Sequence, residues 1–328
     1  MNEREFIRLV ARELGPKEPG LRLGDDAAHF KVRRGFRVVV STDALIEGVH
    51  FSLRYSTLQE VGWRLVAVNM SDLAAMGATP LYFLMDVAFS RGVSDADLEQ
   101  FVGGVGAACA HYGVQLIGGD TDGTPGVTSM AGVGIGACKK PVERGTARVG
   151  DTLVVTNSLG AAHCGWASLD AEVAGWDAMK NKHLRPVARV AEGAILAKSA
   201  SAMIDISDGL SSDLTRLAEE SGKGMLVRAA NIPIHPDATR FCREREWNPL
   251  DIALKSGEEY ELLAAVPPSS VEALARNITK VTGSNLTPVG QVISRKGVYL
   301  EETVEATTGG RKKKVRRPLP ETGYQHSL

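Results

Sequence analysis

One helical stretch constrains the fold of this chain more than any other, because it places a carboxylate among apolar side chains. Apolar residues recur at helical spacing from about Glu60 to Met76, and Gly77 then supplies a helix stop. Within the motif VNMSDLAAMGATP (residues 68–80), Asp72 falls inside the apolar stripe. A buried charge is costly unless it is paired or binds a metal ion. The sequence therefore predicts a buried helix with Asp72 in an ion pair, in a loop cap or at a metal site.

The length and composition point to a two-domain enzyme. The chain has 328 residues, which exceeds a usual single core, so two domains are expected. A net charge of -1 gives no indication of nucleic-acid binding. The 35 glycines and the low aromatic content of 5% fit an α/β or α+β enzyme with many tight turns.

Cysteine usage and hydropathy give an expected location. The four cysteines are scattered and none forms a CxxC motif, so neither a zinc site nor a disulfide framework is indicated. Residues 1–15 are charged and amphipathic, unlike a secretory signal, and no apolar run approaches the length that spans a bilayer. We therefore expect a cytoplasmic protein without a membrane partner.

Further acidic motifs follow expected strands. A buried strand, Phe36–Val40, leads into Ser41-Thr42-Asp43, and a short strand, Val114–Ile117, leads into Gly118-Gly119-Asp120-Thr121. Open α/β sheets bind ligands at the carboxyl ends of strands, and paired glycines let backbone amides approach an anion. Both motifs are therefore candidate parts of a phosphate and cation site.

Two more motifs carry adjacent or alternating acids. Asp25 and Asp26 follow a glycine, which also fits a simple turn. The segment Met203–Gly209 ends in Ser207-Asp208-Gly209 before an expected helix. Ser207 or Asp208 fits the N-cap of that helix, and a helix N-terminus also binds anions.

These acids favour magnesium and phosphate chemistry. The candidate ligands are Asp25, Asp26, Asp43, Asp72, Asp120, Asp205 and Asp208. No histidine or cysteine cluster accompanies them, and hard oxygen ligands suit Mg²⁺, which usually shares its coordination shell with phosphates. No GxxxxGK[ST] loop and no protein-kinase motif set is present. The residues alone therefore predict Mg²⁺-dependent phosphate chemistry.

The polar segment Lys139–Gly150 is the expected junction between a domain of residues 1–138 and one of residues 151–328. The second domain has the pattern of an α+β layer. Its expected strands are Thr152–Thr156, Met225–Val227, Glu259–Val266, Val289–Ile293 and Val298–Leu300, and its expected helices are Ala161–Leu169, Val187–Ser199, Leu210–Glu220 and Ser269–Lys280. The basic run Arg311–Arg317 is expected to be a solvated or disordered edge rather than a nucleic-acid site.

Six motifs together resemble the thiamine-monophosphate kinase family. They are GDDAA (24–28), STDALIEGVHF (41–51), NMSDLAAMGATP (69–80), LIGGDT (116–121), IDISDGL (204–210) and SGEEYELL (256–263). They occur in the family's order and cover nearly the whole chain. Aminoimidazole ribonucleotide synthetase, selenophosphate synthetase and a hydrogenase maturation factor share the acidic ATP site, but EGVHF and the closing glycine-aromatic pair are not expected from them.

The resemblance implies an activity and an architecture. ATP and thiamine monophosphate would give ADP and thiamine diphosphate by direct in-line transfer, assisted by several Mg²⁺ ions. The N-terminal mixed sheet, covered by helices, would join that of a second copy in a shared barrel, and a C-terminal α+β domain would complete the active site.

The resemblance also assigns residues. Mg²⁺ would be held by Asp26, Ser41, Thr42, Asp43, Asp72, Asp120, Asp205 and Asp208; ATP by Tyr112, Gly119, Asp120, Arg144 and Ser207; and the thiamine moiety by His50, Glu258 and Tyr324. No side chain would act as nucleophile or base. The family commonly has Gly-Gly-Glu-Asp where this chain has Ser256-Gly257-Glu258-Glu259, which leaves the substrate acid open by one position.

Three functions stay open at this stage. The first is the kinase, and the second is another ATP-dependent synthetase of the same fold group, with a shared metal site and a different substrate. The third is a non-catalytic nucleotide or thiamine binder. ADP release with thiamine monophosphate separates the three.

Overall fold

The computed structural model describes residues 1–16, 27–28, 30–305 and 312–324. The chain forms two compact units, which are described one at a time. The first contains residues 1–74, 78–141 and 184–190, and the second contains residues 75–77, 142–183 and 191–328. Residues 75–77 and 184–190 therefore belong to a different unit from their neighbours in the chain, so the two units are not two continuous segments of the sequence.

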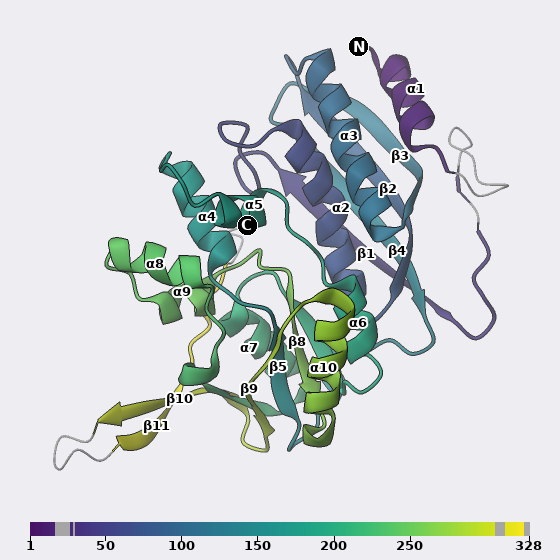
Figure 1. Ribbon diagram of the computed structural model, residues 1–328. Helices are drawn as coiled ribbons and strands as arrows, with labels where there is room; N and C mark the ends of the chain where they lie inside the picture. Colours follow the sequence, from purple (N-terminus) through teal and green to yellow (C-terminus); the bar gives the residue numbers. More distant parts are fainter. Residues whose placement is uncertain (17–26, 29, 306–311, 325–328) are drawn as a thin grey trace. The chain divides into compact units, whose positions relative to one another are not determined.

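The first unit is a four-stranded mixed sheet with helices on one face (Figure 1). The strand order is β1-β4-β2-β3, with β2 and β3 parallel and the other neighbours antiparallel. The strands are β1 (Arg37–Ile46), β2 (Thr79–Ser90), β3 (Gln115–Thr124) and β4 (Ser129–Cys138), and the helices are α1 (Glu3–Leu14), α2 (Leu58–Ala75) and α3 (Asp95–Tyr112).

The limits of α3 follow from its end residues. Ser94 and Asp97 form a capping box at the start, and Gly113 adopts the left-handed conformation that ends the helix. These signals set its bounds at Asp95 and Tyr112. The amphipathic N-terminal segment likewise forms α1, which buries Phe6, Leu9 and Val10.

The glycines of β4 let α2 lie close to the sheet. A Cβ atom on Gly132 would stand 2.4 Å from Nδ2 of Asn69, and one on Gly134 would stand 3.2 Å from the Asn69 carbonyl oxygen. Glycine in a strand permits such a close approach. The same helix is buried on most of its surface, including Leu65, Met70 and Leu73.

Two strands are longer than predicted, so two motifs lie within strands rather than after them. Ser41-Thr42-Asp43 lies inside β1, because β4 pairs with β1 along its whole length. Gly118–Thr121 lies inside β3, which pairs with β2 beyond the glycines. The partner strand sets where each strand ends, and the sequence of the strand alone does not show this.

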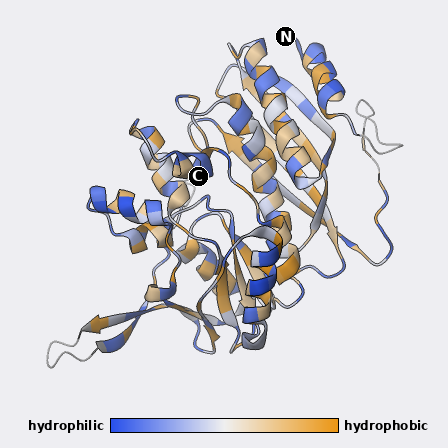
Figure 2. Ribbon diagram, viewed as in Figure 1, coloured by the Kyte–Doolittle hydropathy of each residue, from blue (hydrophilic) through white to orange (hydrophobic). Residues whose placement is uncertain are grey.

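The second unit is built on a seven-stranded sheet of order β11-β10-β7-β9-β5-β8-β6. The strands are β5 (Thr152–Thr156), β6 (Ala202–Ile206), β7 (Gly224–Arg228), β8 (Glu261–Val266), β9 (Leu286–Ile293), β10 (Gly297–Glu305) and β11 (Lys312–Pro318), and the helices are α4 (Ala161–Asp170), α5 (Asp177–Leu184), α6 (Val190–Leu196), α7 (Leu210–Ser221), α8 (Pro236–Glu244), α9 (Pro249–Lys255) and α10 (Val271–Thr282). Strands β6 and β8 are buried throughout, whereas α8 and α10 carry hydrophilic residues (Figure 2).

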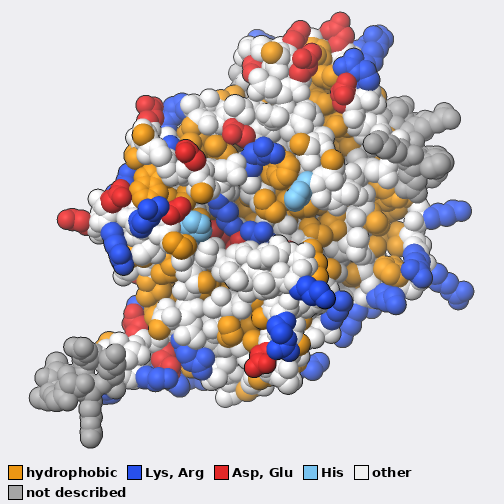
Figure 3. Space-filling view, viewed as in Figure 1, with side chains coloured by type: hydrophobic (Ala, Val, Ile, Leu, Met, Phe, Trp, Pro, Cys, Tyr) orange, Lys and Arg blue, Asp and Glu red, His pale blue; other side chains and the backbone are white. Residues whose placement is uncertain are grey.

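The described part of the basic run is a solvated edge, one of the two expected alternatives: it forms β11, an exposed strand at the end of the sheet, which pairs with β10. Charge complementarity across the two strands favours this pairing. Lys314 and Arg316 lie 3.2 Å and 2.9 Å from carboxylate oxygens of Glu301, and Arg317 lies 2.7 Å from Glu302. Basic and acidic side chains accordingly lie together near this hairpin, at the lower left of Figure 3.

Three helices were not predicted, and one is shorter than predicted. The range expected as Val187–Ser199 contains only α6. Helices α5, α8 and α9 were missed, although α8 and α9 each begin with a proline preceded by a capping residue, His235 or Asn248. Among the described helices, none combines the length and the apolar character that crossing a membrane requires.

We expect the close contact of α2 and α3 to respond to one added methyl group. A Cβ atom on Gly104 would stand 2.0 Å from the carbonyl oxygen of Gln59, so Gly104→Ala should destabilise the fold by about 1–3 kcal/mol. The matched control is Gly103→Ala on the same helix, where nothing lies within 4 Å of an added Cβ, and which should be neutral or stabilising by up to about 1 kcal/mol. Urea denaturation measures both, and equal stability of the two variants would contradict the packing described.

Candidate active site

In the first unit, polar side chains of β1 meet α2. Oγ of Ser41 donates a hydrogen bond to Oδ2 of Asp72, and the backbone N–H of Asp43 donates to Oδ1 of Asn69 at 3.2 Å. Asn69 in turn donates from Nδ2 to the Leu65 carbonyl at 2.9 Å. Half-buried Asp72 therefore has a hydroxyl partner, and its carboxylate lies beside the strand that carries Asp43.

Thr42 and Asp120 lie at exposed positions of the same sheet. The Thr42 hydroxyl donates to the Gly132 carbonyl at 2.9 Å, and Oδ1 of Asp120 accepts from the backbone N–H of Thr121 at 2.9 Å. The packing of the sheet requires glycine at position 119, because a Cβ atom there would stand 2.0 Å from a β2 carbonyl oxygen. The side chains of Thr42 and Asp120, which the resemblance assigns to Mg²⁺ or ATP, are thus held by hydrogen bonds to the backbone.

His50 and Tyr112 both make contacts that shape the first unit. Nδ1 of His50 accepts from the backbone N–H of Ile46 at 3.0 Å, which closes the turn after β1. The Tyr112 hydroxyl accepts from the backbone N–H of Ala188 at 2.9 Å. Their roles in ligand binding stay predictions.

In the second unit, three aspartates gather around the start of α7. Asp205 ends β6 and is 3% exposed, while Asp213 lies fully buried in the first turn of α7. Burial, together with Asp205 and Asp208, raises the pKa of Asp213 well above its ordinary value. Arg216 pairs with Asp208 and lies 3.3 Å from Asp213. Arg216 thus supplies positive charge beside these carboxylates.

The sequence analysis did not identify Asp213, which lies three residues after the motif IDISDGL (204–210) ends. The expected N-cap was also wrong, because neither Ser207 nor Asp208 caps α7. Gly209 takes that position with φ +112°, and a Cβ atom there would stand 2.7 Å from the carbonyl oxygen of Lys255. Ser207 and Asp208 instead form the link between β6 and α7.

The C-terminal segment lies along the start of α7. The backbone N–H of Tyr324 donates to the Asp208 carbonyl at 3.0 Å, and that of Gly323 donates to Oγ of Ser212 at 3.0 Å. A Cβ atom on Gly323 would stand 2.1 Å from the Asp208 carbonyl oxygen, so the close approach requires glycine. The side chain of Tyr324 remains 50% exposed.

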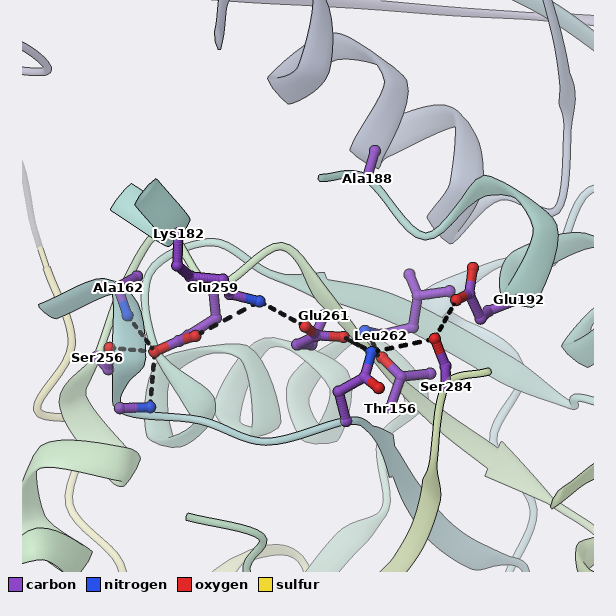
Figure 4. Close-up of polar contacts among 12 residues, drawn as sticks. Thr156, Ala162, Lys182, Ala188, Glu192, Ser256, Glu259, Glu261, Leu262 and Ser284 are labelled. Carbon is purple, nitrogen blue, oxygen red and sulfur yellow. Dashed lines mark hydrogen bonds and ion pairs between the residues drawn. The ribbon is translucent and has the colours of Figure 1, made fainter. Parts of the chain in front are cut away.

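The two glutamates that the sequence left open have different surroundings. Glu259 is fully buried, and its Oε1 accepts from the backbone N–H groups of Gly160 and Ala162 at 2.6 Å and 3.2 Å and from the Ser256 hydroxyl at 2.6 Å (Figure 4). It therefore caps the N-terminus of α4. Burial raises the pKa of Glu259, an effect that Lys182 opposes.

A polar network extends from this cap through the interior of the unit (Figure 4). Lys182 Nζ lies 3.9 Å from Glu259 and donates to Glu261 at 2.5 Å. Glu261 also accepts from the hydroxyl of Thr156 at 2.7 Å and from Nδ2 of Asn157 at 3.1 Å. The network ties the start of β8 to α5 and β5.

Glu258 is the more accessible acid. Its side chain is 31% exposed, and its Oε2 lies 3.2 Å from Nδ1 of buried His183. Its backbone is left-handed, with φ +60°.

The remaining assigned residues are Arg144, which is exposed in the short helix Arg144–Thr146, and Asp26, which lies outside the described residues. Within the described ranges, His, Cys, Asp and Glu do not form a group of three or more that could hold a metal ion. The assigned donors are carboxylate and hydroxyl oxygens, the ligand types that Mg²⁺ prefers.

Comparison with known proteins identifies the family. The AIR synthase related protein family matches at residues 24–138 with its N-terminal domain and at residues 148–302 with its C-terminal domain. The thiamine-monophosphate kinase of Halobacterium salinarum is 36% identical over 313 residues, which cover 94% of this chain and 99% of that protein. The kinase of Aquifex aeolicus is 30% identical over 92% of this chain and 94% of its own length. The chain belongs to the thiamine-monophosphate kinase family.

Solved structures agree with this assignment. The thiamine-monophosphate kinase of Stenotrophomonas maltophilia superposes with a TM-score of 0.80 at 30% identity, covering 90% of this chain and 94% of that one. AaThiL complexed with AMPPCP and TMP gives 0.76 at 29% identity, covering 92% and 95%. Hydrogenase maturation protein HypE of E. coli, at 20% identity and a TM-score of 0.76, shares the fold. The family and the two-domain fold of mixed sheets and helices predicted from the motifs are confirmed.

We expect the two neighbouring glutamates to respond differently to loss of charge. Glu259→Gln should lower the free energy of unfolding by about 1–3 kcal/mol, because the α4 amides and Lys182 lose a buried carboxylate. Glu258→Gln, the matched control, should change it by less than about 0.5 kcal/mol, since that side chain is partly exposed. Urea denaturation followed by tryptophan fluorescence compares them, and a larger loss in Glu258→Gln would contradict the assignment of Glu259 as the cap.

Proposed function

We propose that this enzyme transfers the γ-phosphoryl group of ATP to the phosphate of thiamine monophosphate, yielding ADP and thiamine diphosphate. The observation that carries the proposal is similarity over more than 90% of the chain to AaThiL, whose structure is a complex with AMPPCP and TMP. AMPPCP has the shape of ATP with a methylene group between the β- and γ-phosphorus atoms, so that complex pairs a donor analogue with an acceptor.

The acceptor explains why no catalytic base is needed. The second pKa of a phosphate monoester is about 6, so the attacking oxygen is already ionised near neutral pH. The obstacle is repulsion between two phosphate groups and charge on the leaving oxygen. Positioning and charge neutralisation therefore supply the catalysis, and no side chain needs to act as a nucleophile.

Mg²⁺ ions are part of the proposal. Asp72, Asp43, Asp120, Asp205 and Asp208, with Asp26 and the hydroxyl-bearing Ser41 and Thr42, would hold them. When bound, the ions neutralise phosphate charge and orient the reacting oxygens. The placement of Asp205 in β6 and of Asp208 just before α7 supports this role, since it brings two candidate carboxylates into one short segment.

The nucleotide and the thiamine moiety have separate proposed contacts. Arg144 offers a bidentate guanidinium to the polyphosphate, and Ser207 lies at the start of α7, where backbone N–H groups favour anions. Tyr112 and Gly119 complete the ATP contacts. For thiamine, Glu258 is the better candidate acid, because Glu259 is buried as a helix cap.

Tyr324 and His50 complete the proposed thiamine contacts. The exposed ring of Tyr324 is anchored through its backbone at α7, and an aromatic face attracts a flat cation such as the thiazolium. His50 is half-buried in the turn after β1, which orients its ring.

We also propose a homodimer in the cytoplasm, in which the first units of two copies join their sheets in a barrel. One face of β1 supports this, because Val38, Val40 and Ile46 lie on alternate positions and are 46%, 61% and 37% exposed. A row of exposed β-branched residues along one strand face is typical of an interaction surface.

The purified full chain should convert ATP and thiamine monophosphate to ADP and thiamine diphosphate in a 1:1 ratio when Mg²⁺ is present. ³¹P NMR identifies both products, and EDTA should stop the reaction. Unphosphorylated thiamine is the control acceptor and should release no ADP above background. ADP release without thiamine diphosphate would contradict the proposal and favour another synthetase of the fold group.

Asp72→Asn should lower kcat roughly 100-fold or more, because it removes a charge proposed to hold a cation, while the thermal unfolding temperature changes little. Asp251→Asn, on an exposed face of α9, is the control and should keep full activity. Normal Mg²⁺-dependent turnover by Asp72→Asn would rule out its proposed role.

A further inference from the structure

The loop that carries Glu258 is held in an unfavourable backbone conformation. Glu258 and Tyr260 both have left-handed φ angles, +60° and +50°, on either side of Glu259. Residues other than glycine adopt this region at a cost in free energy, and it persists only where the surroundings impose it. Such outliers gather at functional sites.

Several contacts impose the conformation. The carboxylate of Glu259 is fixed by the α4 amides, and the backbone N–H groups of Glu258 and Tyr260 donate to the carbonyls of Ser207 and Ile206 at 2.6 Å and 2.9 Å. The loop therefore lies against the link between β6 and α7. Anchors on both sides of Glu258 leave its backbone a single arrangement.

The last turn of α5 supplies two neighbouring side chains to this loop. Lys182 contacts the buried Glu259 and Glu261, and His183 contacts Glu258. The imidazole of His183 is 4% exposed, and its Nδ1 lies 3.2 Å from Oε2 of Glu258, whose side chain is 31% exposed. One carboxylate oxygen is thus held against a rigid interior group, while the side chain as a whole still reaches solvent.

We propose that His183 is a positioning residue that orients the Glu258 carboxylate toward the amino-substituted ring of the acceptor. This rests on the proposed function. An exposed glutamate samples many rotamers, and binding a ligand would restrict them at an entropic cost. Contact with a buried imidazole restricts them beforehand, so Glu258 presents its remaining acceptor sites to N–H donors of a heteroaromatic amine.

His183→Phe tests the proposal, because it keeps the ring volume in the interior and removes both nitrogen atoms. The KM for thiamine monophosphate should rise roughly tenfold, with the KM for ATP and kcat nearly unchanged. His183→Asn retains an N–H donor and should recover most of the loss. If the Phe variant does not fold, His183→Leu replaces it.

A double-mutant cycle with Glu258→Gln separates positioning from a structural role. If His183 acts through Glu258, then His183→Phe should change the KM for thiamine monophosphate less than twofold in the Glu258→Gln background. Multiplicative effects of the two substitutions, or an equal rise in the KM for ATP, would overturn the proposal. The control is His235→Leu, which removes the half-buried ring that caps α8 and should lower the unfolding temperature without changing the ratio of the two KM values.

The activity of the wild-type enzyme separates a failure of the proposed function from a failure of the role proposed for His183. If it forms no thiamine diphosphate, the proposed function fails, and this positioning role fails with it. If it forms thiamine diphosphate and His183→Phe has the wild-type KM values, the role of His183 fails while the proposed function stands.

Discussion

The burial of one carboxylate determines much of the second unit. Glu259 is fully buried and binds the first amides of α4, so the start of β8, the start of α4 and the last turn of α5 are joined at one point. A buried carboxylate is stable only when its charge is compensated. Two α4 amides, the Ser256 hydroxyl and the nearby Lys182 supply this compensation, which ties the three elements to one geometry. The strained loop that presents Glu258 depends on that anchor. The buried Glu259 therefore determines the conformation of the partly exposed Glu258.

The same constraint, negative charge held on rigid backbone, recurs where phosphate chemistry is proposed. Asp205 ends a fully buried strand and Asp208 follows it, with the buried Asp213 beside them on α7. In the first unit, Asp72 is held by a hydroxyl from β1. In the proposed function, bound Mg²⁺ would relieve the repulsion among these carboxylates, so cation binding and the arrangement of the site would be coupled.

Periodicity and end signals were enough to predict some regular elements, such as α7 and β5, but not α5, α8 and α9. Features set by contacts distant in the sequence were not predictable. No local sequence pattern indicates that Glu259 caps α4, which lies nearly 100 residues away in the chain. The contact between His183 and Glu258 likewise has no local sequence signal. The basic run forms a strand because acids of β10 lie opposite it. Likewise β4 extends β1 through Ser41–Asp43.

In the proposed mechanism, cations bound by the protein's carboxylates, rather than a protein base, drive transfer to a phosphate acceptor. The most direct test is the initial rate of thiamine diphosphate formation against free Mg²⁺, with ATP held saturating and fully complexed. We predict that the rate continues to rise with free Mg²⁺ after all ATP is in the Mg²⁺ complex, because the protein's own sites must also fill. A rate that reaches its maximum as soon as ATP is complexed would contradict the claim.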